Sequence, residues 1–110
     1  MAKQQNMTYA VIGLGNFGIA VAETMASAGQ DVIAIDKSPI AVQSVADTVS
    51  NAVCADSMDI ELLKEAGVQD ADVAIVSMGS HLEACVTTIL NLQELGIKNI
   101  IAKANNERYK

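Results

Sequence analysis

The sequence has no tryptophan, one proline, one phenylalanine and two tyrosines, and it lacks any excess of positive charge. With so few aromatic side chains, a core has to be built from Ala, Val, Ile, Leu and Met, a composition typical of an α/β sheet protein. Thirteen acidic residues against seven basic ones give a formal net charge of -6 at pH 7. Such a chain repels the phosphate backbone of DNA and RNA, so no nucleic acid partner is expected.

Long apolar runs are also missing. None approaches the roughly 20 residues that a helix needs to cross a bilayer, and residues 1–6 are too polar for a signal peptide. A cytoplasmic protein without direct membrane insertion is therefore expected.

The two cysteines, Cys54 and Cys85, lie far apart in the sequence, and there is one histidine. No metal site and no disulfide framework is indicated, and we expect two buried, inert thiols.

The chain does contain a regular alternation of β-rich apolar runs with segments of helical period. The runs cover residues 9–12, 32–35, 52–55, 73–76 and 100–102. Five strands separated by four helices predict an α/β fold with a doubly wound, parallel sheet and right-handed crossovers. Residues 1–110 are expected to form one domain. Because a parallel sheet commonly continues, and residues 105–110 read as the opening of a helix, we expect an excised part of a longer chain, truncated after the fifth strand.

Several residues predict where the helices begin and end. Ser38 and Pro39 are expected to be the N-cap and first residue of the second helix, and the third helix is expected to begin near Asp56 or Ser57. The first, third and fourth helices are expected to end at glycines, namely Gly29, Gly67 and Gly96.

The apolar faces of the first and fourth helices carry two further expectations. The first helix is expected to bury Phe17, Val21, Met25 and Ala28. In the fourth, over about residues 80–95, apolar side chains cover roughly two-thirds of the circumference. A clearly polar stripe is left only at Glu83, Thr87, Asn91 and Glu94. The apolar excess indicates contact with another subunit or with a further part of the chain, and a broad contact with the protein's own core is the alternative.

The segment GLGNFG directly follows the first strand and opens the first helix, with the pattern G-x-G-x-x-G at Gly13, Gly15 and Gly18. In a Rossmann-like fold of three layers, α/β/α, the first glycine permits a tight turn. The second lets a pyrophosphate approach the backbone, and the third lets the helix pack closely on the strand. The phosphates then meet free N–H groups at the helix start, where Asn16 and Phe17 lie. The motif predicts dinucleotide or adenine nucleotide binding; glycines used only for tight packing are the alternative.

Residues at the ends of the other strands are expected to complete the site, because ligands of such sheets bind at the carboxyl ends of the strands. Asp36 ends the second strand, and its carboxylate is expected to accept hydrogen bonds from ribose hydroxyls and to repel a 2′-phosphate, which disfavours NADP. Lys37 softens that repulsion or is simply solvated. Asp56 and Ser57 follow the third strand, where a purine would lie, and Asp56 is also a candidate helix cap.

The fourth strand is followed by a short polar loop that is expected to face the same crevice. The loop consists of Ser77, Met78, Gly79 and Ser80. His81 is expected to be an exposed residue of the next helix and not a base, because no partner carboxylate or nucleophile is indicated.

These residues lie within four segments that follow one another along the chain: YAVIGLGNFG, VIAIDKS, VCADSMDIELLKEAGVQDADVAIVSMG and NIIAKANNERYK. Together they resemble the N-terminal half of RCK domains, also called KTN or TrkA-N domains. That family supplies the cytosolic regulators of bacterial potassium channels and of the Trk and Ktr potassium uptake systems. The resemblance covers nearly the whole chain, although the glycine motif alone is shared with many dehydrogenases. It implies a domain that binds NAD(H), ADP or ATP as a regulatory signal and not as a reactant.

The resemblance also implies roles for site residues. Gly13 and Gly15 would contact the phosphates and Asp36 the ribose. The segment after the third strand, Ala55, Asp56 and Ser57, would hold the adenine. Lys103, at the end of the fifth strand, would face either the crevice or the solvent.

Asn16 departs from the family pattern. Several Ktr-type regulators carry an arginine within the glycine loop that reaches the terminal phosphate of ATP across a dimer contact. A neutral amide cannot make a charge-assisted fork to phosphate. The asparagine therefore favours NAD(H) or a diphosphate and leaves the discrimination of ATP from ADP open.

Members of the family form homo-oligomers, as dimers and often as octameric rings, that grip a membrane-embedded potassium transporter subunit. The resemblance therefore implies a location at the inner face of the membrane through this partner. A non-enzymatic, nucleotide-sensing domain of a potassium uptake system or channel is the favoured function, acting by a population shift between ring geometries. The cofactor-binding domain of an NAD-dependent dehydrogenase is the alternative, but it would need a substrate pocket and an acid or base that the chain does not encode. A module that regulates something other than potassium is a third possibility.

Overall fold

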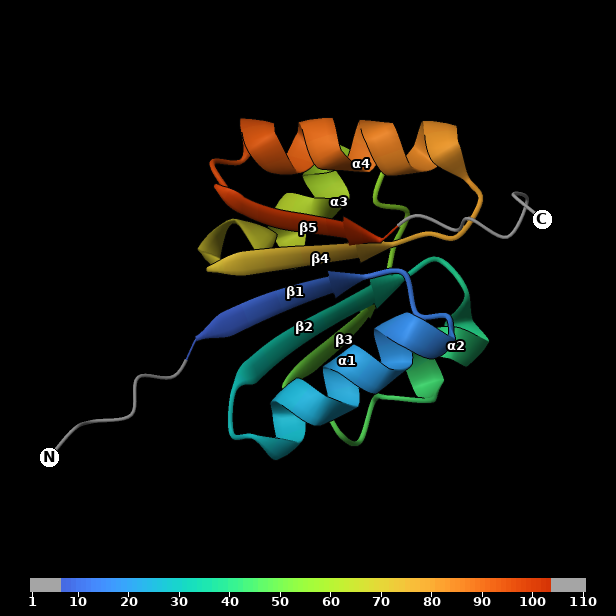
Figure 1. Ribbon diagram of the computed structural model, residues 1–110, viewed down its shortest axis with the longest axis vertical. Helices are drawn as coiled ribbons and strands as arrows, with labels where there is room; N and C mark the ends of the chain where they lie inside the picture. Colours follow the sequence, from blue (N-terminus) through green and yellow to red (C-terminus); the bar gives the residue numbers. More distant parts are fainter. Residues whose placement is uncertain (1–6, 104–110) are drawn as a thin grey trace, which may run out of the picture.

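The computed structural model describes residues 7–103, in which a five-stranded sheet has helices on both faces (Figure 1). The strands are β1 (Thr8–Ile12), β2 (Asp31–Asp36), β3 (Asn51–Cys54), β4 (Val73–Ser77) and β5 (Asn99–Lys103). Their order is β3-β2-β1-β4-β5, and all neighbours pair in parallel. The predicted strands are confirmed, with ends that differ by no more than one residue. The Rossmann-like fold class is confirmed as well.

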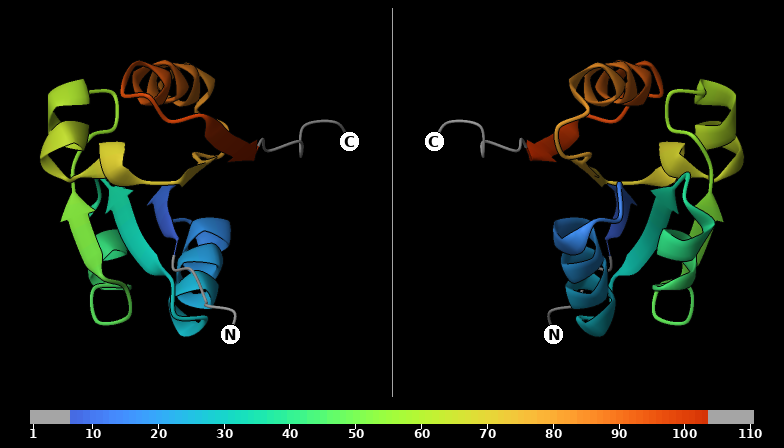
Figure 2. Two further views of the ribbon diagram at one scale, coloured as in Figure 1. Left: turned by 90° about the vertical axis from the view of Figure 1, so that its left-hand side faces the viewer. Right: turned by 90° about the vertical axis from the view of Figure 1, so that its right-hand side faces the viewer.

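The helices are α1 (Asn16–Ser27), α2 (Pro39–Gln43), α3 (Ile60–Glu65) and α4 (Leu82–Glu94), and a 3₁₀ helix, η1 (Val68–Asp70), follows α3. Helices α1 and α2 cover one face of the sheet, and α3 and α4 cover the other (Figure 2). Alternate residues of the central strands therefore enter two separate cores. Val11 and Val32 pack beneath α1 and α2, whereas Ile12 and Ile35 pack beneath α3 and α4. Being buried on both faces explains why these strands read as continuous apolar runs.

The start of α2 follows the prediction. The Oγ atom of Ser38 accepts a hydrogen bond from the Ala41 N–H at 3.3 Å, and Pro39 is the first helical residue. The regular helix ends at Gln43, yet Val45 and Val49 in the turns that follow are still buried. The apolar residues therefore remain buried beyond the end of the helix.

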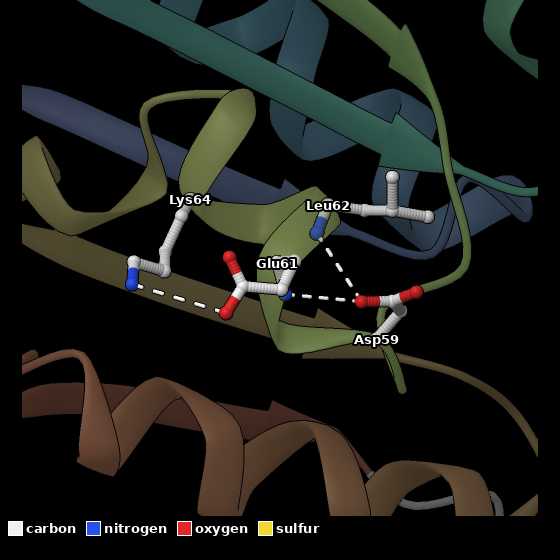
Figure 3. Close-up of polar contacts among 4 residues, drawn as sticks. All are labelled: Asp59, Glu61, Leu62 and Lys64. Carbon is white, nitrogen blue, oxygen red and sulfur yellow. Dashed lines mark hydrogen bonds and ion pairs between the residues drawn. The ribbon is translucent and has the colours of Figure 1, made fainter.

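The predicted start of α3 is wrong. The helix begins at Ile60, and its N-cap is Asp59, whose Oδ1 accepts from the N–H groups of Glu61 at 3.0 Å and Leu62 at 3.4 Å (Figure 3). Asp56 instead closes a turn, in which its Oδ1 accepts from the Met58 N–H at 3.0 Å. Asp56 and Asp59 are both suited to cap a helix. Because Asp56 forms a turn, the helix begins a few residues later, after Asp59.

The predicted buried face of α1 is wrong in part. Phe17 is 41% exposed and Ala28 is exposed, while Gly18 and Ala22 are buried. The close approach of Gly18 to the strand-end turn decides this rotation. A Cβ atom built at Gly18 would come within 1.9 Å of the Gly13 carbonyl oxygen, so this side of the helix has to face the sheet.

The apolar excess on α4 is present as an exposed stripe of Leu82, Val86 and Leu90. The polar stripe predicted beside it is wrong in part, because Asn91 is half-buried and donates to the Ser57 carbonyl oxygen at 3.1 Å.

The burial predicted for the two cysteines is wrong at Cys54, which is exposed at the end of the edge strand β3, while Cys85 is half-buried.

The helix predicted for residues 105–110 lies outside the described residues. Within residues 7–103, no helix combines the length and the apolar character that crossing a bilayer requires.

Candidate functional site

A cleft of about 530 Å³ opens at the carboxyl ends of β1, β2, β3 and β4. The strand order reverses between β1 and β4, so the loops after these two strands lead to opposite faces of the sheet. Ligands of open α/β sheets bind at such a point. The structure brings eleven of the twelve predicted binding residues to the walls of this cleft: Gly13, Gly15, Asn16, Phe17, Asp36, Lys37, Ala55, Asp56, Ser57, Met78 and Gly79.

Two glycines of the motif are required by the fold itself. Gly13 has a φ of +99°, and a Cβ atom there would lie 2.0 Å from the Ser77 carbonyl oxygen. Gly18 meets the Gly13 carbonyl in the same way. Tight packing, the alternative to ligand binding, therefore accounts for these two positions.

Gly15 is different, because nothing in the fold requires it to be glycine. Its φ of -79° and ψ of -163° are accessible to any residue, and a Cβ atom there would meet no atom within 4 Å. Gly15 lines the cleft and is the N-cap of α1, with no side chain capping the helix. No side chain therefore covers the N–H groups of the first helical turn at Gly15. Such uncovered N–H groups are suited to bind a phosphate group.

Asp36 connects the glycine loop to the end of β2. Its Oδ2 accepts from the Leu14 N–H at 2.7 Å, and its Oδ1 accepts from the Ser38 N–H at 2.9 Å. This structural role of Asp36 was not predicted from the sequence. Each carboxylate oxygen has a second acceptor position, and the half-buried Asp36 also lines the cleft. The carboxylate can therefore hold the loop and still accept from a ligand hydroxyl.

The segment after β3 forms another wall. Ala55 and Ser57 are buried and Asp56 is half-buried. The Ser57 hydroxyl lies 2.6 Å from that of Thr88 on α4, so it is already paired within the protein. Met78, which is half-buried, and Gly79 also line the cleft, and the sulfur of Met78 lies 3.9 Å from the Ser57 hydroxyl oxygen.

The two lysines predicted for the site lie at different places. Lys37 is exposed and lines the cleft. Lys103 is not among the lining residues; its Nζ atom lies 5.4 Å from the centroid of the Phe17 ring, which does line the cleft. This cation–π contact places its charge next to the cleft and not inside it.

The cleft has further lining residues that sequence reasoning did not single out as ligand contacts. Leu14, Met58 and Ala84 are apolar and carry no sequence signal for binding. His81 also lines the cleft, and it is exposed as predicted, at the N-cap of α4 with Nδ1 3.1 Å from the Met78 carbonyl oxygen. Over residues 7–103, no three His, Cys, Asp or Glu side chains are grouped so as to hold a metal ion.

A glycine loop, a strand-end acid and a cleft at the reversal of strand order form one site, and a family model covers the same part of the chain. The model for the TrkA-N domain matches residues 9–110. The chain belongs to the TrkA-N domain family. Among its relatives, Ktr system potassium uptake protein C of Bacillus subtilis is 38% identical over 99 residues, which cover 90% of this chain and 45% of the relative. Ktr system potassium uptake protein A of Vibrio alginolyticus is 33% identical over 104 residues, covering 94% and 47%.

The TrkA-N domain described here thus spans about half the length of the curated relatives that it matches. Two solved structures share its fold. The NAD(P)-binding domain of an exopolyphosphatase-related protein from Archaeoglobus fulgidus has a TM-score of 0.76 at 23% identity, and the match covers 96% of this chain and 78% of that one. The TrkA-N domain of the inner membrane protein ybaL from Escherichia coli has a TM-score of 0.63 at 16% identity, with coverages of 97% and 92%.

Proposed function

We propose that this TrkA-N domain binds an adenine nucleotide, NAD(H), ADP or ATP, as a regulatory ligand of a potassium uptake system or channel. The single observation that carries nucleotide binding is Gly15. Its side-chain position is empty, its backbone conformation suits any residue, and it begins α1 at the wall of the cleft. The fold leaves room for a side chain at this position, so close approach of a ligand phosphate is a physical reason for a glycine at the start of α1.

The lining residues suggest how the parts of the nucleotide would be bound. The phosphates would accept from N–H groups at the start of α1, where Asn16 and Phe17 follow Gly15. The ribose hydroxyls would donate to Asp36, whose negative charge disfavours a 2′-phosphate. The adenine would then lie against the segment Ala55, Asp56 and Ser57.

The link to potassium rests on relatives. Proteins named as Ktr and Trk system potassium uptake proteins are similar over at least 90% of this chain. We infer that the domain is a non-enzymatic module of a longer protein. This protein would bind a membrane-embedded potassium transporter subunit and would thereby lie at the inner face of the membrane. The ligand would act by its different affinity for two conformations of the assembly.

Identifying the compound that copurifies with the protein tests the proposal of nucleotide binding. The protein is denatured, and mass spectrometry identifies what is released. We expect an intact adenine nucleotide, and we expect calorimetry with ADP, ATP and NADH to show saturable binding without chemical change. Failure of all three nucleotides to bind, or turnover of the bound one, would contradict the proposal.

We also infer a homo-oligomer, a dimer or an octameric ring, with the stripe of Leu82, Val86 and Leu90 at a subunit contact. Light scattering should give a mass above the 11.5 kDa of one chain. Replacing both Leu82 and Leu90 with lysine should lower that mass towards the monomer, because two charges would have to be buried. Ile40→Lys is the matched control, since Ile40 is 84% exposed on α2. A monomeric wild-type chain at high concentration, or equal loss of association in the control, would contradict the interface.

A further inference from the structure

A buried polar bridge runs beneath the cleft, from the segment after β3 to helix α4. Ser57 and Thr88 are 4% and 0% exposed, and their hydroxyl oxygens lie 2.6 Å apart. The Asn91 side chain, one turn along α4 from Thr88, donates to the Ser57 carbonyl oxygen at 3.1 Å. The Thr88 hydroxyl also donates to the sulfur of Met78 at 3.5 Å.

Packing alone does not call for this bridge. The side of α4 that faces the sheet packs through apolar residues such as Cys85, Ile89 and Leu92. A valine would fill the place of Thr88 with the same shape. Buried hydroxyls in an apolar core are tolerated only when each finds a partner, so the pair fixes one relative position of the two segments.

The bridge has one end at the cleft and the other on the helix. Ser57 and Met78 line the cleft, whereas Thr88 and Asn91 do not. Ala55 is tied to β2, because its N–H donates to the Asp36 carbonyl oxygen at 3.0 Å. Two residues further on, Ser57 is tied to α4. The segment that is proposed to contact the adenine is therefore bonded to helix α4 on the side away from the cleft.

We propose that Thr88 and Asn91 are positioning residues of the cleft and that they transmit its occupancy to α4. This inference rests on the proposed function, namely that a nucleotide binds in the cleft. A ligand that fits the bridged position of Ser57 favours that position, and through the two bonds it orders α4. By linkage, loss of the bridge lowers ligand affinity and removes the response of the helix.

The test uses ADP as the probe, with calorimetry for affinity and amide hydrogen exchange for the response of each segment. In the wild-type chain, ADP is expected to slow exchange at the glycine loop and in α4. In Thr88→Val, ADP affinity should fall about threefold to tenfold, and the slowing in α4 should be clearly reduced while that of the loop remains. Thr88→Ser keeps the hydroxyl and should restore both readouts.

Two further variants separate this role from stability. Thr87→Val is the matched control, because Thr87 is a half-buried neighbour on α4 outside the bridge, and it should respond like the wild type. If Thr88→Val fails to fold, the double variant Ser57→Ala with Thr88→Val removes both hydroxyls and leaves neither unpaired. It should fold and show the same loss of response in α4.

The outcomes also separate this inference from the proposed function. ADP that protects the glycine loop but not α4 in the wild type would overturn the bridge as a transmitter and leave nucleotide binding intact. Undiminished protection of α4 in Thr88→Val would do the same. No binding of ADP, ATP or NADH and no protection anywhere would overturn both.

Discussion

Gly13→Ala is expected to lower the free energy of unfolding by about 3–5 kcal/mol, a large part of the stability of a small domain. Two costs combine at this position. The backbone has a φ of +99°, which an alanine adopts only under strain, and the new methyl group would lie 2.0 Å from the Ser77 carbonyl oxygen. That oxygen belongs to the end of a central strand and cannot move without disturbing the sheet. Urea denaturation of the variant measures the loss.

Gly67→Ala is the matched control for this experiment. Gly67 has a φ of +85°, but a Cβ atom there would meet nothing within 4 Å. Its replacement should therefore cost only the backbone strain, about 1 kcal/mol. Equal losses in the two variants would mean that the contact between the turn after β1 and the end of β4 is not tight, contrary to this description of the loop.

Asp36→Ala is expected to weaken ADP binding about tenfold or more and to lower the free energy of unfolding by about 1–3 kcal/mol. The carboxylate accepts from two backbone N–H groups, those of Leu14 and Ser38, and alanine leaves both without this acceptor. It also removes the acceptor proposed for the ribose hydroxyls. Calorimetry measures the affinity, and urea denaturation measures the stability.

Asp47→Ala removes the same charge from an exposed site that does not line the cleft. It should leave both quantities close to those of the wild type. If Asp36→Ala loses stability while its ADP affinity stays unchanged, Asp36 holds the loop but does not contact the ligand. If both quantities stay unchanged, the two short hydrogen bonds do not have the importance assigned to them.

The sheet and most of the cleft were predictable because they follow from local rules. Strands buried on both faces read as short apolar runs, and the glycine motif between the first run and a helix marks the carboxyl end of β1. Once the sheet is parallel, the residues that follow each strand must lie at one edge. Asp36, Ser57 and Met78 could thus be assigned to one crevice without any contact being known.

The errors arose where two local solutions compete or where the partner is distant in sequence. Asp56 and Asp59 both suit a helix cap, and only the turn closed by Asp56 decides between them. Phe17 was expected in the core because it shares the apolar helical spacing of Val21 and Met25, but the tight contact of Gly18 turns it outwards. Asn91 was assigned to a polar surface stripe because its partner, the Ser57 carbonyl, lies 34 positions away in the sequence.

The central claim is that a nucleotide phosphate lies against the open backbone at Gly15. Calorimetric titration of ADP into the wild-type chain and into Gly15→Ala tests it most directly, together with the unfolding midpoint of each. The free protein has room for the methyl group and a suitable backbone conformation, so stability should change by less than about 1 kcal/mol. The account predicts that the ADP affinity nevertheless falls about tenfold or more, whereas an equal affinity in the two proteins would contradict it.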